Sequence, residues 1–163
     1  MSLESVFASL THRYQRVRTG LAVGIADPDY DILRALRGGV WMQVPLTPEF
    51  PFEDRQFEVV VMDGSAVSRD SVREAHRVLR PEGCLFFTVQ EKSGQDGDGF
   101  SAPDIYKIVR EGYDIVELKR PPWWVFGRRG RTLTVCARKK NWREHRGLVR
   151  DGALALMPFR SRT

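Results

Sequence analysis

Apolar residues recur along the chain with two different periods, and this pattern predicts alternating helices and strands. Apolar positions three or four residues apart predict helices at 3–14, 27–37, 70–79 and 101–112. Uninterrupted apolar or β-branched runs predict buried strands at 17–26, 40–44, 58–62, 84–89, 113–118 and 132–137. This alternation is typical of an α/β fold with a mostly parallel sheet. We expect the last two strands to pair antiparallel, because no long crossover separates them.

Capping residues indicate where two of the helices begin and end. Asp27 is the expected N-cap of one helix, with Pro28 as its first residue, and Gly38–Gly39 ends it. Ser68 or Asp70 is expected to cap the next helix. We predict one domain over residues 1–140, followed by a basic C-terminal extension over 141–163.

Two segments in the middle of the chain resemble a known family. Pro51–Val61 reads PFEDRQFEVVV and is similar to the LPF-x-D-x-SFD-VV segment of the class I, Rossmann-like S-adenosylmethionine (SAM)-dependent methyltransferases. Val72–Gly83 reads VREAHRVLRPEG and resembles their REAxRVLKPGG helix and turn, with the turn at Arg80–Gly83. The resemblance covers about half of the chain. It implies a Rossmann-like, mostly parallel sheet with helices on both faces and an antiparallel last strand.

The same resemblance implies a SAM site at the first strand–loop–helix, where the family has an acid followed by GxGxG. The counterpart here is Ala22–Pro28, in which Gly24 keeps the first glycine, Ala26 replaces the second and Pro28 the third. The acids that follow would repel the carboxylate of SAM but attract its ammonium and sulfonium groups. A well-capped helix without a ligand is the alternative. The cofactor-binding residues that the resemblance implies in this loop are Val23, Gly24, Ile25 and Asp27.

The next part of the chain is shorter than the family pattern. The interval between Ala26 and Val40 holds one helix and no more, so one strand–helix unit is expected to be missing, with the family's ribose-binding acid. Counting back from Pro51, the family's adenine-contacting position falls on Leu46. Asp63, with Gly64, follows a central strand, where open α/β sheets bind ligands. The Asp63 carboxylate would contact the cofactor, act as a general base, or form an Asx turn.

Charge is distributed unevenly along the chain. The net charge of +5 combines 13 Lys/Arg and 19 Asp/Glu in residues 1–117 with 13 Lys/Arg and 2 Asp/Glu in residues 118–163. Cations beside aromatic rings are typical of surfaces that bind nucleic acid. They are also frequent at protein–protein interfaces, which for this chain would be the interface of a homo-oligomer. Tryptophans that cover the open edge of the sheet, or that simply belong to the core, are further alternatives. The residues expected on this polyanion or partner surface are Arg120, Trp123, Trp124, Arg128, Arg129 and Arg131.

Several function classes are not favoured by the sequence. Cys84 and Cys136 lie in strand-like runs, and without CxxC or a Cys/His cluster we expect no metal site. His76 is expected on a helix surface. The apolar runs are too short to cross a membrane, and the start of the chain has no secretory pattern, so a cytoplasmic location is the default.

Two hypotheses follow from these patterns. The first is SAM-dependent methyl transfer to an acceptor that the sequence does not identify, for which a polyanion would suit the basic C-terminal region. The second is a non-catalytic binding or assembly module with the same fold, which acts through that basic, tryptophan-rich region. No catalytic residue is assigned, and fold alone does not choose between the hypotheses.

Overall fold

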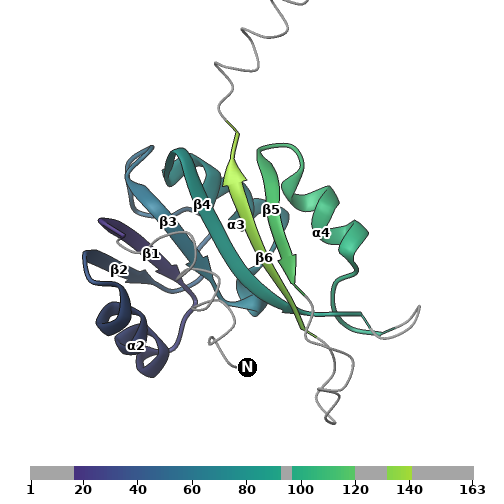
Figure 1. Cartoon of the computed structure of the whole chain (residues 1–163), viewed down its shortest axis with the longest axis horizontal. Helices are drawn as coiled ribbons and strands as arrows, with labels where there is room; N and C mark the ends of the chain where they lie inside the picture. The colour runs from purple at the N-terminus through teal and green to yellow at the C-terminus, as the bar shows by residue number, and fades with distance from the viewer. Residues whose placement is uncertain (1–16, 93–96, 120–131, 141–163) are drawn as a thin grey trace, which may run out of the picture.

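The computed structural model describes residues 17–92, 97–119 and 132–140 (Figure 1). Six strands make one sheet: β1 (Thr19–Val23), β2 (Val40–Val44), β3 (Phe57–Met62), β4 (Leu79–Gln90), β5 (Tyr113–Lys119) and β6 (Thr132–Lys139). Three α-helices and a short 3₁₀ turn connect them: α2 (Asp27–Arg37), η1 (Gly64–Ala66), α3 (Arg69–Val78) and α4 (Ala102–Val109). The helix predicted at 3–14 and the extension predicted at 141–163 lie outside the described residues.

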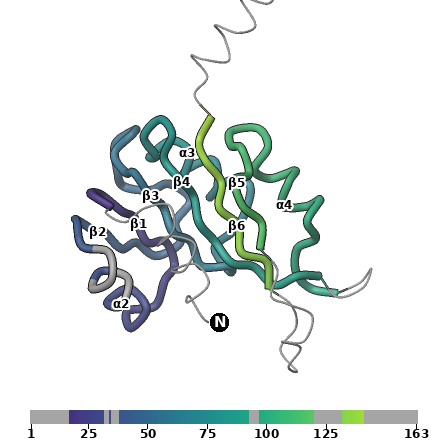
Figure 2. Tube along the Cα trace, viewed as in Figure 1, coloured from purple at the N-terminus to yellow at the C-terminus, as the bar shows by residue number. Residues whose placement is uncertain are grey.

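The strand order in the sheet is β2-β1-β3-β4-β6-β5. Strands β2, β1, β3 and β4 are parallel to one another, whereas β6 is antiparallel to both β4 and β5. This confirms the predicted Rossmann-like sheet with an antiparallel last strand. The Rossmann order 3-2-1-4-5-6 has a third strand outside the second. Here β2 is the edge strand of the described sheet, so the missing unit is the outermost one (Figure 2).

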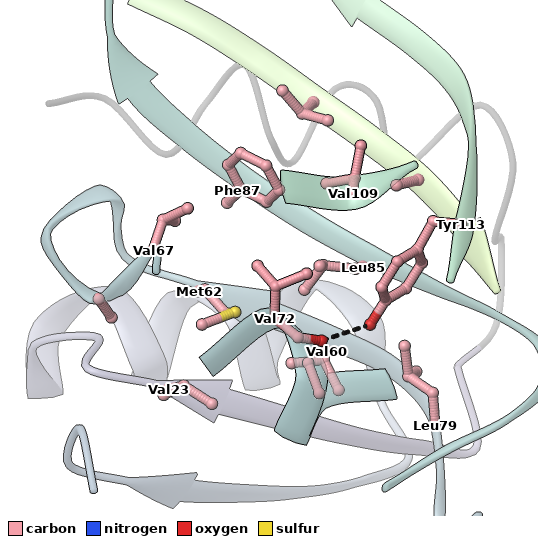
Figure 3. Close-up of a cluster of buried hydrophobic side chains, with 14 of the residues drawn as sticks. Val23, Val60, Met62, Val67, Val72, Leu79, Leu85, Phe87, Val109 and Tyr113 are labelled. Atoms are coloured by element: carbon pink, nitrogen blue, oxygen red, sulfur yellow. Dashed lines mark hydrogen bonds between the residues drawn. The ribbon is translucent and has the colours of Figure 1, made fainter. Parts of the chain in front are cut away.

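One face of the sheet is covered by α3 and α4, and the larger part of the core lies there; Figure 3 shows side chains of this core. The amphipathic pattern of α3 explains this, because its apolar residues Val72, Ala75 and Val78 are all buried. Tyr113 at the start of β5 lies fully inside this core. Its hydroxyl donates a hydrogen bond to the Val72 carbonyl at 3.0 Å, which satisfies the one polar atom that its ring carries inward.

The opposite face holds a second, smaller cluster of buried residues. Tyr30 of α2 packs against it, and its hydroxyl donates to the carbonyl of Trp41 on β2 at 2.8 Å. The Trp41 indole nitrogen donates to the Gly38 carbonyl at 2.9 Å, which ties β2 to the end of α2. The sheet residues in this cluster include Ala22, Val59, Val61, Cys84, Phe86 and Cys136.

Two boundary predictions need correction. Asp27 is the first residue of α2 and not its N-cap; Ala26 holds the cap position without a side-chain hydrogen bond. The turn expected at Arg80–Gly83 lies inside β4, where the pairing with β3 jumps from Phe57↔Leu79 to Val59↔Cys84. The turn-forming residues therefore form an irregularity within a long strand, with Glu82 at a positive φ of 63°.

Candidate functional site

An open cavity of about 520 Å³ lies at the carboxyl ends of β1 and β2. The loop that leads from β1 into α2 forms one wall, and the end of β2 with the two residues after it forms the other. Ligands bind at this edge in open α/β sheets, and the volume is within the usual range of small-molecule sites. The lining residues are Gly24, Ile25, Ala26, Asp27, Gln43, Val44, Pro45 and Leu46.

Gly24 fixes the turn at the bottom of the cavity. Its φ is +66°, a left-handed conformation that other residues adopt only with strain. Its amide donates to the Val44 carbonyl at 2.9 Å, so the loop is attached to the end of β2. A Cβ at this position would come within 3.3 Å of the Ala66 Cβ and 3.8 Å of the Asp63 Cβ. The glycine therefore allows the loop that lines the cavity to pack closely against the turn after β3.

Gln43 joins the two walls of the cavity, and the sequence analysis did not identify it. Its side-chain amide nitrogen donates to the Ile25 carbonyl at 2.8 Å and to Asp27 Oδ1 at 2.9 Å. These two bonds hold the loop and the first residue of α2 against β2. The signal in the sequence is a single polar residue near the carboxyl end of an otherwise apolar strand.

The start of α2 makes this wall of the cavity acidic. Among the described residues that line the cavity, Asp27 is the one with a formal charge, and Asp29 follows in the same helical turn. Pro28 has no amide hydrogen, so this helix end offers fewer donors to an anion than an ordinary one. The wall thus suits a cationic group better than a phosphate or carboxylate.

Asp63 lies beside the cavity, at the end of β3. Its amide donates to the Val23 carbonyl at 3.0 Å, and Gly24 is its neighbour across the sheet. The carboxylate accepts the Ser65 amide at 3.0 Å and also the Ser65 hydroxyl, an Asx turn that begins η1. Gly64 is explained by packing, because a Cβ there would lie 2.3 Å from the Thr88 carbonyl oxygen. Neither residue lines the cavity.

The structure brings together four of the seven residues predicted to bind a cofactor: Gly24, Ile25, Asp27 and Leu46. Leu46 lies directly beyond β2 and is 51% exposed, so it faces the open side of the cavity. Val23 differs, because its side chain is fully buried in the main core and only its backbone reaches the loop (Figure 3).

The basic aromatic segment predicted to bind a polyanion or partner, Arg120 to Arg131, lies outside the described residues. Within the described ranges, no three His, Cys, Asp or Glu side chains gather in a way that could hold a metal ion. Nor does any described helix combine the length and apolar character needed to cross a membrane.

Comparisons by sequence find no matching family model and no matching curated protein. Comparison by structure finds SAM-dependent methyltransferases. One from Aquifex aeolicus is 14% identical with a TM-score of 0.65, over 84% of this chain and 89% of that one. The 1,6-didemethyltoxoflavin-N1-methyltransferase of Burkholderia thailandensis, solved with S-adenosylhomocysteine (SAH), is 16% identical with a TM-score of 0.60, over 85% and 77%. One from Methanosarcina mazei is 12% identical with a TM-score of 0.55, over 80% and 96%. The chain therefore has the fold of these methyltransferases.

Proposed function

We propose that the protein binds SAM in the cavity between the β1–α2 loop and the end of β2, and that it is a SAM-dependent methyltransferase. The observation that carries this proposal is the cavity of about 520 Å³ built around Gly24 at the carboxyl ends of two parallel strands. Its place in a methyltransferase-like sheet and its size both suit an adenosyl ligand. The Burkholderia thailandensis neighbour, which was solved with SAH, supports the choice of ligand.

The lining residues match the parts of SAM in kind. Val44, Pro45 and Leu46 offer an apolar wall to the adenine ring, and Gly24 allows the backbone to approach the ligand. Asp27 offers a carboxylate to the positively charged ammonium or sulfonium. No lysine or arginine is among the lining residues, so the methionine carboxylate has no cationic partner within the described cavity wall.

When bound, SAM supplies a methyl group on a sulfonium, which is already activated for transfer to a nucleophile. The contribution of this chain is then to hold the donor and to orient the acceptor. The Asp63 carboxylate is engaged by Ser65, so its first role is to shape the loop after β3. The acceptor is not assigned; a polyanionic acceptor at the basic segment remains a prediction from the sequence.

Calorimetric titration with SAM and with SAH tests the proposal. We expect saturable binding by the wild type and a loss of at least about tenfold in affinity for Gly24→Val, because a Cβ there would press on the Ala66 Cβ at 3.3 Å and displace the loop that lines the cavity. Gly38→Val is the matched control, because Gly38 has a similar φ of +59° at the other end of α2 but has open space around it. Absence of binding at about 1 mM SAM, or equal losses in both variants, would contradict the site.

The charge of the cavity gives a second, independent test. Asp27→Asn keeps an oxygen that can accept the Gln43 amide but removes the negative charge. It should weaken the binding of SAM, whose sulfonium is positive, more than the binding of SAH, whose thioether sulfur is uncharged. We expect the ratio of the SAM and SAH affinities to change by roughly three- to tenfold. Asp31→Asn is the control, because Asp31 is an exposed acid on the same helix that does not line the cavity. If both affinities fall and their ratio is unchanged, Asp27 contacts the ammonium group that SAM and SAH share; unchanged affinities for both ligands would remove Asp27 from the site.

A further inference from the structure

The two edges of the sheet differ in how they are protected against pairing with another strand. Natural edge strands usually carry charged side chains or proline, which discourage such pairing. Strand β5 follows this rule with Asp114, Glu117 and Lys119. Strand β2, with the sequence VWMQV, has neither a charge nor a proline. The β2 edge is therefore chemically open to a further strand.

The backbone of β2 presents unused hydrogen-bonding groups at this edge. Val40 donates to the Arg18 carbonyl at 2.8 Å, and the Val44 carbonyl accepts from Gly24 at 2.9 Å, so both residues direct their backbone toward β1. Alternation along the strand turns the backbone groups of Trp41 and Gln43 outward. The Trp41 carbonyl accepts a hydrogen bond from the Tyr30 hydroxyl, whereas the outward-facing amides of Trp41 and Gln43 donate to no other described residue.

Apolar side chains are exposed along the same edge. Val40 is 66% and Met42 is 41% exposed, and alternation places both on the face that α3 and α4 cover further along the sheet. With Leu46 they account for three of the five large hydrophobic residues that are exposed among those whose side chains the structure describes. In a sheet with a third strand outside the second, this surface would be covered.

We propose that β2 pairs antiparallel with β2 of a second copy of this chain, about a two-fold axis at Met42, so that two six-stranded sheets become continuous. In this register Met42 lies opposite Met42 and Val40 lies opposite Val44. Trp41 and Gln43, whose backbone groups point outward, then face each other as hydrogen-bonded pairs on both sides of the axis. The strand is apolar at both ends and in the middle, so it is complementary to its own reversed copy.

The charges on α2 favour a second copy over an unrelated strand. Helix α2 connects two parallel strands and therefore runs opposite to β2. Its first half carries Asp27, Asp29 and Asp31, and its second half carries Arg34, all four of them residues whose side chains are described. The two-fold axis sets the two α2 helices antiparallel on the same side of the joined sheet, so the acidic half of each faces the basic half of the other. This inference does not depend on SAM binding.

Sedimentation equilibrium of the full chain, from about 1 to 200 μM, tests the proposal, because an interface of this small size is expected to be concentration-dependent. We expect a monomer–dimer equilibrium in the wild type. Met42→Lys places two like charges together at the axis and should raise the dissociation constant at least about 100-fold. Tyr106→Lys is the matched control, because Tyr106 is 57% exposed on α4, far along the sheet, and should leave the constant unchanged.

A cysteine variant tests the register. At a non-hydrogen-bonded antiparallel pair the two Cα atoms are about 4.5 Å apart, which a disulfide spans. Met42→Cys should therefore form a covalent dimer under mild oxidation, whereas Val40→Cys and Tyr106→Cys should not; the native Cys84 and Cys136 are buried. A monomeric wild type at 200 μM, a dimer that Met42→Lys does not weaken, or equal crosslinking of the three variants would each overturn the proposal.

Discussion

The two halves of the sheet are stabilised to different degrees. In the C-terminal half, β3 to β6 with α3 and α4, both helices begin with a reciprocal capping box, Ser68 with Ser71 and Ser101 with Asp104. In the N-terminal half, β1, α2 and β2, the helix begins at Ala26 without a side-chain cap. The better anchored half holds most of the core, and the other half holds the cavity and the open edge. Binding surfaces commonly lie in the less stable part of a fold.

The ends of the helices show the same difference. Lys139 of β6 donates its ammonium group to the carbonyls of His76 and Leu79 at 2.6 and 2.7 Å, which anchors the end of α3 in the sheet. Arg77 ties the same helix to the segment before β3 through Asp54 and the Phe50 carbonyl. The end of α2 has the hydrogen bond from the Trp41 indole to Gly38. We infer that the C-terminal half carries the stability on which the N-terminal half depends.

Truncating one side chain in each half should give the largest difference between the halves, measured as loss of unfolding free energy. Phe87 of β4 is fully buried between the sheet and the helices, so Phe87→Ala should lower the free energy of unfolding by about 3–5 kcal/mol (Figure 3). Met42→Ala on the exposed β2 edge should cost less than about 1 kcal/mol in the monomer. Urea denaturation at low protein concentration measures both. Similar losses would mean that the N-terminal half is packed as firmly as the other.

The pH dependence of the unfolding free energy should report on a group in the C-terminal half, the imidazole of His76 on α3. Burial of His76, and then the charge of Lys139, lower the pKa of this histidine from 6.5 to about 4. The unfolded chain therefore binds a proton that the folded chain resists, so the contribution is complete above pH 6.5 and is lost as pH falls toward 4. After allowance for solvent screening, we expect a loss of roughly 1–2 kcal/mol between pH 7 and pH 5.

His76→Gln removes the titrating group and serves as the comparison for that pH experiment. Its unfolding free energy should change much less between pH 7 and pH 5 than that of the wild type. The window stays above the range in which Glu74, whose pKa is lowered mainly by its hydrogen bond with Arg77, begins to lose its own contribution. A wild type and variant with the same pH dependence would assign the loss to other groups. The sequence analysis placed His76 on a helix surface; the structure packs its ring edge-on against Tyr113.

The features predicted correctly from the sequence depend on local patterns. Strand β2 has the predicted bounds 40–44, because Gly39 and Pro45 flank its apolar run and limit where the strand can begin and end. Ser68 was one of the two expected caps of α3, and its side chain does accept the Ser71 amide. The antiparallel pairing of the last two strands followed from the absence of a long crossover between them, which is also a local property.

The features that were missed depend on contacts between distant residues. Asp27 was expected to cap α2, but its carboxylate accepts a hydrogen bond from Gln43, 16 residues further along the chain. Gln43, which holds the loop and the start of α2 against β2, was not identified, because its two partners Ile25 and Asp27 lie 18 and 16 residues away in the chain. Only the pairing of strands shows which unit is missing, since each candidate strand has a similar apolar sequence.

Exchanging caps between the halves gives the smallest expected effect and the most direct test of the comparison. Ser68→Ala should cost about 1 kcal/mol, because the Ser71 amide loses its acceptor. Ala26→Ser should gain only about 0.5 kcal/mol, although Ala26 already has the extended backbone of an N-cap (φ −66°, ψ 149°).

The gain is limited because Pro28 has no amide hydrogen, which leaves Asp29 as the donor within reach of a serine at position 26. Hydrogen exchange of the β1 and β2 amides is the decisive measurement. If the N-terminal half opens separately, Ala26→Ser should slow exchange there and leave β4 unchanged, whereas Ser68→Ala should speed exchange in both halves. An equal response of β1 and β4 to Ala26→Ser would show instead that the sheet opens as one unit, and the division into two halves would then describe packing but not stability.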